Sequence, residues 1–311
     1  VLLVLAVQAT WVDKKYVTVW DEFGRYKPRE IMEQVPHGTG EYRVAVPARG
    51  GFYELWKMRF FMDNRIVDAE NEDRASRPVE EQEVFNQWAR QPARYWQLAS
   101  VKNVFLPASY AEKLDREVEW VKAFDVDAQG QIVSMERGKG PHAWLRLTHT
   151  LPRAAVYPAE IVSSRDALLR RLADPAWNPA GSVLITNAVD GMPAAGSFVP
   201  AVIASYSPNR VTIDVPAGAG GIVMLTDRYD PGWRVKVDGV RETLLRCNGI
   251  MRGVAVRPGA RRVEFFYAPY MGSFAVSAAA VLIVLVWAIA GSLAKRRLRP
   301  QAVSDAARIG G

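Results

Sequence analysis

One uncharged stretch near the C-terminus constrains this chain more than any other feature. Residues Ser273–Ala294 read SFAVSAAAVLIVLVWAIAGSLA and contain no Asp, Glu, Lys or Arg. An α-helix needs about 20 apolar residues to cross the hydrocarbon core of a bilayer. The alternative is a helix buried in a globular core, but wholly apolar core helices of this length are uncommon. We therefore predict a transmembrane helix over residues 273–294.

The residues after this stretch predict its orientation. Lys295, Arg296, Arg297 and Arg299 follow the apolar run almost without interruption. Clusters of Lys and Arg stay on the cytoplasmic side of a membrane. We therefore expect residues 295–311 to form a cytoplasmic basic tail and the large polar region before the span to be extracytoplasmic.

The chain opens on a second apolar stretch, VLLVLAVQA at Val1–Ala9, with no basic residue ahead of it. It has two interpretations. Residues 1–10 are the end of an upstream transmembrane helix, or they are the end of a signal peptide with a cleavage site near Ala9. The missing basic start favours the first, which would make this chain the C-terminal part of a longer, multi-pass protein.

The net charge of +7 is concentrated in the tail. Residues 295–311 contain five Lys or Arg and one Asp, about +4, so about +3 remains for the much larger region before them. A nucleic-acid-binding domain has a stronger basic footprint than this. We therefore expect no nucleic-acid partner and assign the tail to topology and to attraction by anionic lipid headgroups. Cys247 is the single cysteine, which excludes an intrachain disulfide.

Residues 11–176 are expected to form a mixed α/β extracytoplasmic domain. Short apolar runs predict strands, and runs that follow Pro or Ser with acidic first turns predict helices. The expected strands are Tyr42–Val46, Val101–Leu106, Trp144–Leu147 and Ala154–Tyr157, and the expected helices are Gly51–Met62, Val79–Ala89 and Arg165–Ala173. Residues 175–181 have linker composition and mark the expected domain boundary.

The segment Asp125–Glu136, DVDAQGQIVSME, allows two structures. Its spacing matches a calcium-binding loop, in which the ligands would be Asp125, Asp127, Gln129 and Glu136. Gly and Pro at positions 138–141 prevent the exiting helix that such a loop requires. The other structure is a β-hairpin with strands at 119–124 and 131–135 that turns at 127–130. We favour the hairpin.

Residues 182–269 show short β-rich runs at regular spacing, separated by Gly, Pro, Asn and Asp. The expected strands are Val183–Thr186, Ala201–Ser207, Arg210–Val215, Gly221–Thr226, Trp233–Val237, Thr243–Arg246, Met251–Val256 and Arg261–Tyr267. Strands at such intervals are typical of an antiparallel β-sandwich. The predicted fold class is α+β: a mixed α/β region, an antiparallel β-sandwich and one C-terminal transmembrane helix.

Several segments, in order along the chain, resemble one family. They are VQATWVDKKY at Val7–Tyr16, YWQLASVKNVFL at Tyr95–Leu106, LPRAAVYP at Leu151–Pro158, DRYDPGWRVKVDG at Asp227–Gly239 and VEFFYAP at Val263–Pro269. Together they resemble the C-terminal part of YfhO-type bacterial membrane proteins, which are large multi-pass proteins similar to GT-C glycosyltransferases. No single segment would suffice for this resemblance.

The segment Asp227–Gly239 has a structural and a functional interpretation. Structurally, Pro231-Gly232 and Asp238-Gly239 are turns, and Trp233 alternates with its neighbours toward a core. Functionally, the segment is a sugar-contacting surface. Tyr229 or Trp233 would stack on a pyranose ring, and Asp230 or Asp238 would accept hydrogen bonds from hydroxyl groups.

The resemblance implies lipid-linked glycosyl transfer, in which a sugar moves from a polyprenyl-phosphate carrier to a cell-envelope glycan outside the bacterial inner membrane. In GT-C-like enzymes the catalytic acids lie in outer loops of a membrane half that would precede this chain. We therefore expect no catalytic residue, metal ion or cofactor here. The expected partners are the bilayer, the lipid-linked donor and the glycan acceptor. The alternative is a membrane-anchored β-sandwich that binds glycan without catalysis or has a purely structural role.

Overall fold

The computed structural model of the protein describes residues 28–35, 42–61, 66–69, 78–114, 118–128, 130–186, 197–269 and 272–297. The chain forms two compact units, Val1–Phe266 and Tyr267–Gly311, and each is described by itself. The apolar start at 1–10 and the basic tail beyond Arg297 lie outside the described residues. What the sequence suggests for these two segments stays a prediction.

The first part of the larger unit contains a five-stranded sheet. Its strand order is β1-β2-β5-β3-β4, in which β1 runs parallel to β2 and the other neighbours are antiparallel. The strands are β1 (Arg43–Ala45), β2 (Val101–Pro107), β3 (Val118–Val126), β4 (Ile132–Met135) and β5 (His142–Leu147). The strands predicted at 42–46, 101–106 and 144–147 are confirmed.

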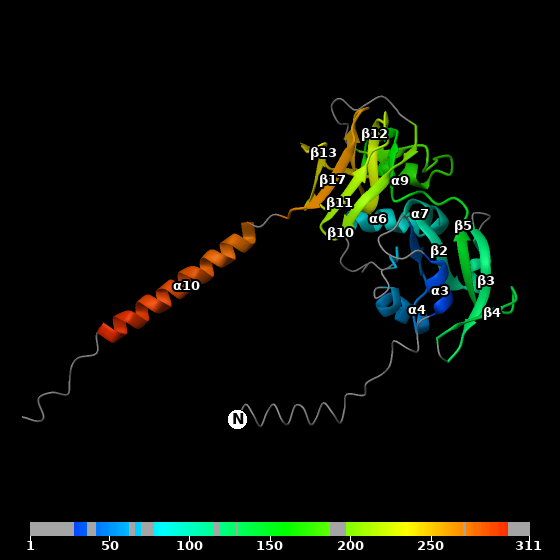
Figure 1. Ribbon diagram of the computed structural model, residues 1–311, viewed down its shortest axis with the longest axis horizontal. Helices are drawn as coiled ribbons and strands as arrows, with labels where there is room; N and C mark the ends of the chain where they lie inside the picture. The colour runs from blue at the N-terminus through cyan, green and yellow to red at the C-terminus, as the bar shows by residue number, and fades with distance from the viewer. Residues whose placement is uncertain are drawn as a thin grey trace, which may run out of the picture. The chain divides into compact units, whose positions relative to one another are not determined.

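Side chains alternate between the two faces of this sheet, and each face packs against its own hydrophobic cluster. On β5, Trp144 faces one hydrophobic cluster, whereas Ala143 and Leu145 face another. The first face is covered by α3 (Arg29–Gln34) and α4 (Gly51–Leu55), and α4 continues as a π-helix over Trp56–Phe60 (Figure 1). The second face is covered by α7 (Pro92–Leu98) and α8 (Ala108–Ala111). The helix predicted at 51–62, packed by aromatic side chains, is confirmed over its described residues, 51–61.

The segment that resembled a calcium loop is a β-hairpin. Strands β3 and β4 pair antiparallel up to the closing pair of Val126 and Ile132. The Asp127 carboxylate accepts a hydrogen bond from the backbone N–H of Gln131 at 2.8 Å, which fastens the turn. Asp125 likewise accepts one from a backbone N–H. Within the described residues, no group of three or more His, Cys, Asp or Glu side chains is placed to hold a metal ion.

Two further five-stranded sheets share one core. Their orders are β10-β11-β17-β13-β14 and β15-β16-β12-β6-β9. The strands are β6 (Ala154–Tyr157), β9 (Val199–Pro200), β10 (Val202–Ser207), β11 (Arg210–Asp214), β12 (Gly221–Arg228), β13 (Trp233–Val237), β14 (Val240–Glu242), β15 (Leu245–Cys247), β16 (Met251–Val256) and β17 (Arg262–Tyr267). The mixed α/β fold class with antiparallel sheets is confirmed.

One predicted strand was placed wrongly. The run at 243–246 is not a single strand, because β14 ends at Glu242 and β15 begins at Leu245. These two strands belong to different sheets, so residues 243–244 are the crossing from one sheet to the other. The apolar pattern alone does not reveal such a crossing, because it looks the same in either sheet.

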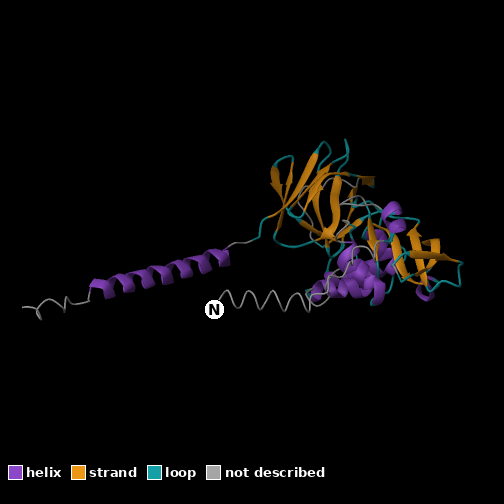
Figure 2. Cartoon of the chain, turned by 60° about the horizontal axis from the view of Figure 1, so that its bottom comes forward, coloured by secondary structure: helices purple, strands orange, loops and turns teal. Residues whose placement is uncertain are grey.

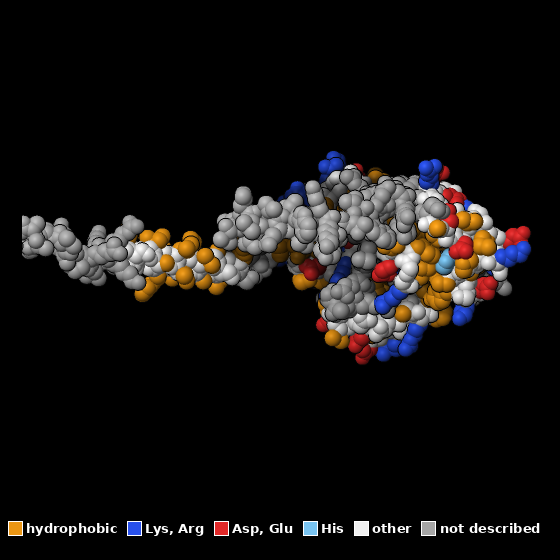
Figure 3. All heavy atoms as spheres, turned by 90° about the horizontal axis from the view of Figure 1, so that it is seen from below, with side chains coloured by type: hydrophobic (Ala, Val, Ile, Leu, Met, Phe, Trp, Pro, Cys, Tyr) orange, Lys and Arg blue, Asp and Glu red, His pale blue; other side chains and the backbone are white. Residues whose placement is uncertain are grey.

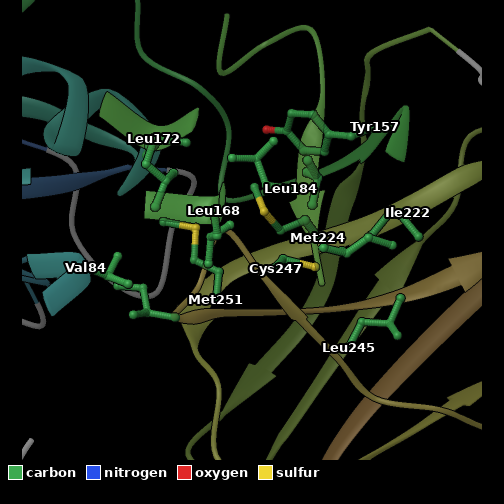
Figure 4. Close-up of a cluster of buried hydrophobic side chains, with 14 of the residues drawn as sticks. Val84, Tyr157, Leu168, Leu172, Leu184, Ile222, Met224, Leu245, Cys247 and Met251 are labelled. Atoms are coloured by element: carbon green, nitrogen blue, oxygen red, sulfur yellow. The ribbon is translucent and has the colours of Figure 1, made fainter. Parts of the chain in front are cut away.

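Strand β12 is the centre of the larger unit and is buried on both faces. Val223 and Leu225 pack into the core between the two sheets, together with Phe265 of β17. Ile222 and Met224 point the other way, into the cluster of Figure 4. That cluster is completed by α6 (Val79–Trp88), α7 and α9 (Arg165–Ala173), as the labelled Val84, Leu168 and Leu172 in Figure 4 illustrate.

Strand pairing crosses the expected domain boundary at 175–181. Strand β6, which precedes the boundary in sequence, pairs with β12 from Ala154↔Leu225 to Tyr157↔Ile222. A two-stranded parallel sheet likewise joins β7 (Ala159–Ile161) to β8 (Val183–Ile185). The division into domains at 11–176 and 182–269 stays a prediction, with β6 as a strand that both sides share.

The second unit contains α10 (Gly272–Arg297), which Figure 2 shows as one uninterrupted helix. Its stretch Val276–Leu293 is long and apolar enough to cross a membrane. Figure 3 shows hydrophobic side chains along the described helix, and Trp287, for example, is 76% exposed. The helix predicted at 273–294 is confirmed, and its length and composition suit a membrane span.

Candidate functional site

A buried carboxylate on β12 is surrounded by three arginines. The side chain of Asp227 is 9% exposed. Its Oδ1 accepts hydrogen bonds from Arg43 Nη2 and Arg153 Nη2, both at 2.5 Å, and its Oδ2 accepts one from Arg252 Nη2 at 2.7 Å. Tyr206 Oη donates another to Oδ2 at 3.2 Å. We call these five residues the Asp227 cluster.

Three guanidinium groups against one carboxylate leave a formal charge of about +2 in a buried place, which needs further compensation. Aromatic rings supply part of it. The guanidinium of Arg252 lies 3.6 Å from the ring centroid of Trp233, and that of Arg153 lies 4.6 Å from the ring of Tyr206. Cation–π contacts of this kind stabilise arginines that are removed from water.

The electrostatics of the cluster keep Asp227 ionised. Burial by itself would raise the pKa of this carboxyl group. The charges of Arg153, Arg43 and Arg252 outweigh burial and hold the pKa of Asp227 well below its usual range. A carboxylate that stays charged at neutral pH and is saturated with donors serves to hold other side chains in place. It does not have the raised pKa of a general acid.

The two aromatic residues predicted to contact a sugar lie close to this cluster. Trp233 is the first residue of β13, and its ring contacts the guanidinium of Arg252. The same side chain packs against the core between the two sheets. Tyr229 directly follows β12, and its ring lies 4.5 Å from the guanidinium of Arg246. The two rings thus contact arginines of β16 and β15. These contacts agree with the structural interpretation of the segment, and sugar contacts by these rings stay a prediction.

The two predicted acidic residues bind backbone groups. Asp230 accepts a hydrogen bond from the N–H of Gly232 at 2.7 Å, which shapes the turn before β13. Asp238 accepts from the N–H groups of Arg261 and Arg262 at 3.2 and 2.9 Å. Asp238 also has a φ of 49° in the hairpin between β13 and β14, as a tight Asp-Gly turn requires. Each carboxylate therefore has a structural role, and hydrogen bonds to sugar hydroxyls stay a prediction.

Sequence reasoning missed Asp227, although it is the first residue of the segment Asp227–Gly239. A signal was present, because an aspartate within a strand as apolar as β12 needs a partner for its charge. The partners could not be found in the sequence. Arg43 is 184 residues from Asp227 and Arg153 is 74 residues away.

A groove runs along α6, α7 and α8. It consists of two cavities, of about 480 and 730 Å³, which share Ala89, Pro92, Tyr110 and Lys113 in their walls. Both volumes are in the range of ordinary ligand sites. Sequence reasoning did not predict this α6–α8 groove, because its walls come from three helices and the loop at 175–179, whose packing the sequence does not show.

Aromatic rings form much of the wall of the smaller cavity. The aromatic wall residues are Phe85, Trp88, Tyr95, Trp96 and Tyr110. Trp88 and Tyr95 are stacked with their centroids 5.2 Å apart, and Phe85 lies edge-on to both. Such mutual packing fixes the rings before any ligand arrives.

Polar groups accompany these rings. Side-chain amides in the walls of the two cavities belong to Gln82, Asn86, Gln91, Gln97 and Asn178. The indole Nε1 of Trp88 is buried and has no hydrogen-bond partner among the residues that the structure describes. Rings and amide groups in one groove can bind a ligand that has both apolar faces and many hydroxyl groups.

Comparison with protein-family models gives no match, and neither does comparison with curated proteins. Among solved structures, two of the mycobacterial arabinofuranosyltransferase AftD match parts of the chain. A mutant form matches at 20% identity over 25% of this chain and 7% of its own, and the other structure at 14% over 53% and 12%, each with a TM-score of 0.21. The chain thus spans about a tenth of the proteins it matches. A TM-score this low does not establish a shared fold.

Proposed function

We propose that this chain is the extracytoplasmic, glycan-binding region of a membrane protein that resembles lipid-linked glycosyltransferases. The observation that supports it most directly is the α6–α8 groove, with its aromatic wall and amide groups. The helix α10, which suits a membrane span, supports the membrane anchor. In this proposal α10 lies in a bacterial inner membrane and the Lys295–Arg299 cluster is cytoplasmic, as the positive-inside rule predicts.

Carbohydrate is the ligand class that best fits the walls of the groove. A pyranose ring has an apolar face of C–H groups that stacks on aromatic rings, and its edge carries hydroxyl groups that both donate and accept hydrogen bonds. Amide side chains can do both in return. Tyr110 is the most accessible ring, with 38% of its surface exposed, and it borders both cavities. It is the natural first contact for a sugar.

The transferase version of this proposal assigns the reaction to another part of the protein. A membrane-embedded catalytic half would bind the polyprenyl-phosphate sugar, and this region would hold the glycan acceptor. The second version is a tethered, non-enzymatic glycan-binding module. The reading frame upstream of residue 1 separates the two. Many predicted spans with acidic outer loops would support the transferase, whereas a start codon and a short basic region would support the tethered module.

Glycan binding itself is tested with the full chain in lipid nanodiscs. Neutral and acidic oligosaccharides are titrated and followed by tryptophan fluorescence and by ligand-observed NMR. Tyr110→Ala should weaken binding about tenfold, because a ligand that covers about 50 Å² of the ring at roughly 25 cal/mol per Å² gains about 1.3 kcal/mol.

Tyr229→Ala is the matched control, since it removes the same kind of ring from the segment first predicted to contact sugar. Loss of affinity in this variant alone would move the site from the groove to that segment. If no oligosaccharide binds the wild-type chain, the glycan-binding proposal is wrong and a structural role remains.

A further inference from the structure

We propose that the α6–α8 groove selects saccharides that carry an anionic group over neutral ones. This inference rests on the proposed function, because it names the class of glycan that the same groove binds. Its basis is the charge of the groove. The charged side chains in the walls of the two cavities are Arg90, Arg94 and Lys113, and no described Asp or Glu belongs to either wall.

The acidic side chains of α6 are engaged elsewhere, and Glu112, which precedes Lys113 in sequence, belongs to neither wall. Helix α6, which supplies part of the groove, begins with three glutamates. Glu80 pairs with Arg246, Glu81 with Arg228 and Glu83 with Arg165, at distances between 2.6 and 3.3 Å. These arginines lie on β15, β12 and α9, so the three pairs tie α6 to the sheet and to α9. The glutamates of α6 are thereby not available to neutralise the groove.

Two of the cations in the groove are free to meet a ligand. Arg94 has a structural role, because it donates to the carbonyl oxygens of Asp174 and Trp177 and so attaches α7 to the loop after α9. Arg90 and Lys113 are exposed, and among the described residues neither pairs with a carboxylate. They are the two groups that could meet an anion without breaking an existing contact.

The position of Lys113 joins the charge to the aromatic wall. Its backbone N–H donates to the carbonyl oxygen of Tyr110 in the turn that ends α8, at 3.1 Å. Both residues border both cavities. A sugar stacked on Tyr110 would therefore bring its ring substituents near the Lys113 ammonium. A carboxylate or phosphate substituent gains a charge-assisted hydrogen bond there, whereas a neutral hydroxyl gains a weaker one.

The test compares the same oligomers with and without negative charge. The full chain in nanodiscs is titrated with oligogalacturonates and alginate oligomers, and with the same oligomers after methyl esterification of their carboxyl groups. We expect the acidic forms to bind about three to ten times more tightly at low salt, and we expect added salt to reduce this ratio.

Lys113→Met should lower the ratio of acidic to esterified affinity toward one. Lys139→Met is the matched control, since Lys139 is exposed, pairs with Glu136 and borders neither cavity; it should leave the ratio unchanged. Equal affinity for both forms, or a preference that survives in Lys113→Met combined with Arg90→Met, would overturn the inference while leaving glycan binding intact. Absence of binding by every oligomer would instead refute the proposed function.

Discussion

Removal of the charge at Asp227 should destabilise the larger unit more than any single surface change. In Asp227→Asn the side chain keeps its shape, but the arginines at positions 43, 153 and 252 lose the carboxylate that contacts all three. These three side chains are 8%, 1% and 4% exposed, so water cannot replace the lost partner. Three buried cations would then face one another across a neutral amide.

The magnitude follows from the geometry. Breaking a buried ion pair by removing one partner costs about 3–5 kcal/mol. Each of the three contacts is a charge-assisted hydrogen bond of 2.5–2.7 Å, for which net contributions of about 1.5–3 kcal/mol are typical. Asparagine retains one acceptor oxygen, so the loss should be smaller than the sum over all three hydrogen bonds. We therefore expect the free energy of unfolding to fall by about 3–5 kcal/mol. For a domain of this size it corresponds to a melting temperature lowered by roughly 6–20 °C.

The assay is thermal unfolding of the full chain in nanodiscs, followed by intrinsic tryptophan fluorescence. Asp214→Asn is the matched control, because Asp214 also pairs with an arginine, Arg262, at 3.4 Å, but with half of its side chain exposed. Exposed pairs contribute about 0–1 kcal/mol, so this variant should stay close to the wild type. If Asp227→Asn melts within about 2 °C of Asp214→Asn, the cluster does not stabilise the fold as argued.

The stability difference between the wild type and Asp227→Asn should also depend on pH. A carboxyl group whose pKa is depressed by folding stabilises the folded state above its unfolded pKa of about 3.9, and this contribution is lost as the pH falls toward the folded pKa. The difference in stability between the wild type and Asp227→Asn should therefore be constant from pH 8 to about pH 5 and decrease only in stronger acid. A difference that already decreases between pH 7 and 6 would mean that another group is responsible.

Two further predictions concern the core and the membrane topology. Gly253→Ala on β16 should be strongly destabilising in the same melting assay, because the new Cβ would lie 2.6 Å from Cys247 Sγ and 2.9 Å from the carbonyl oxygen of Val223. A melting temperature equal to that of the wild type would show that the strand can shift. A cysteine at Asn209, in the exposed turn between β10 and β11, should react with an impermeant maleimide on intact cells, whereas one at Ala302 should react only after permeabilisation. The reverse pattern would invert the predicted topology.

Much of the fold could be predicted from local patterns. Helix α9 was predicted at its observed bounds, since Ser164 caps it by accepting a hydrogen bond from the N–H of Ala167 and Asp174-Pro175 follows it. Strand β6 was likewise predicted at its observed bounds. Where prediction failed, the missing information was tertiary. The pattern of residues 240–247 does not reveal that the chain changes sheets there, and nothing near β6 reveals that its neighbour is β12.

The site was harder to predict for a related reason. The sequence drew attention to Tyr229, Asp230, Trp233 and Asp238, which stand out as aromatic and acidic residues in a turn-rich segment. Their observed contacts are with arginines and backbone N–H groups close by. The groove depends on the packing of α6, α7 and α8, and each helix shows only an ordinary mixture of apolar and polar residues. A binding surface made of several short helices has no local signature.

The Asp227 cluster contacts the end of α7, a helix that forms part of the groove. Arg43 of the Asp227 cluster also donates to the carbonyl oxygen of Ala99, the residue that caps α7, at 2.8 Å. The next residue, Ser100, is fully buried with a φ of 61°, and its Oγ lies 3.2 Å from the hydroxyl of Thr226, the neighbour of Asp227 on β12. Helix α7 supplies Tyr95 and Trp96 to the aromatic wall, so the cluster holds that wall against the sheet. A change at Asp227 that weakens glycan binding would therefore indicate displacement of α7, whereas direct contact with a sugar is tested at Tyr110.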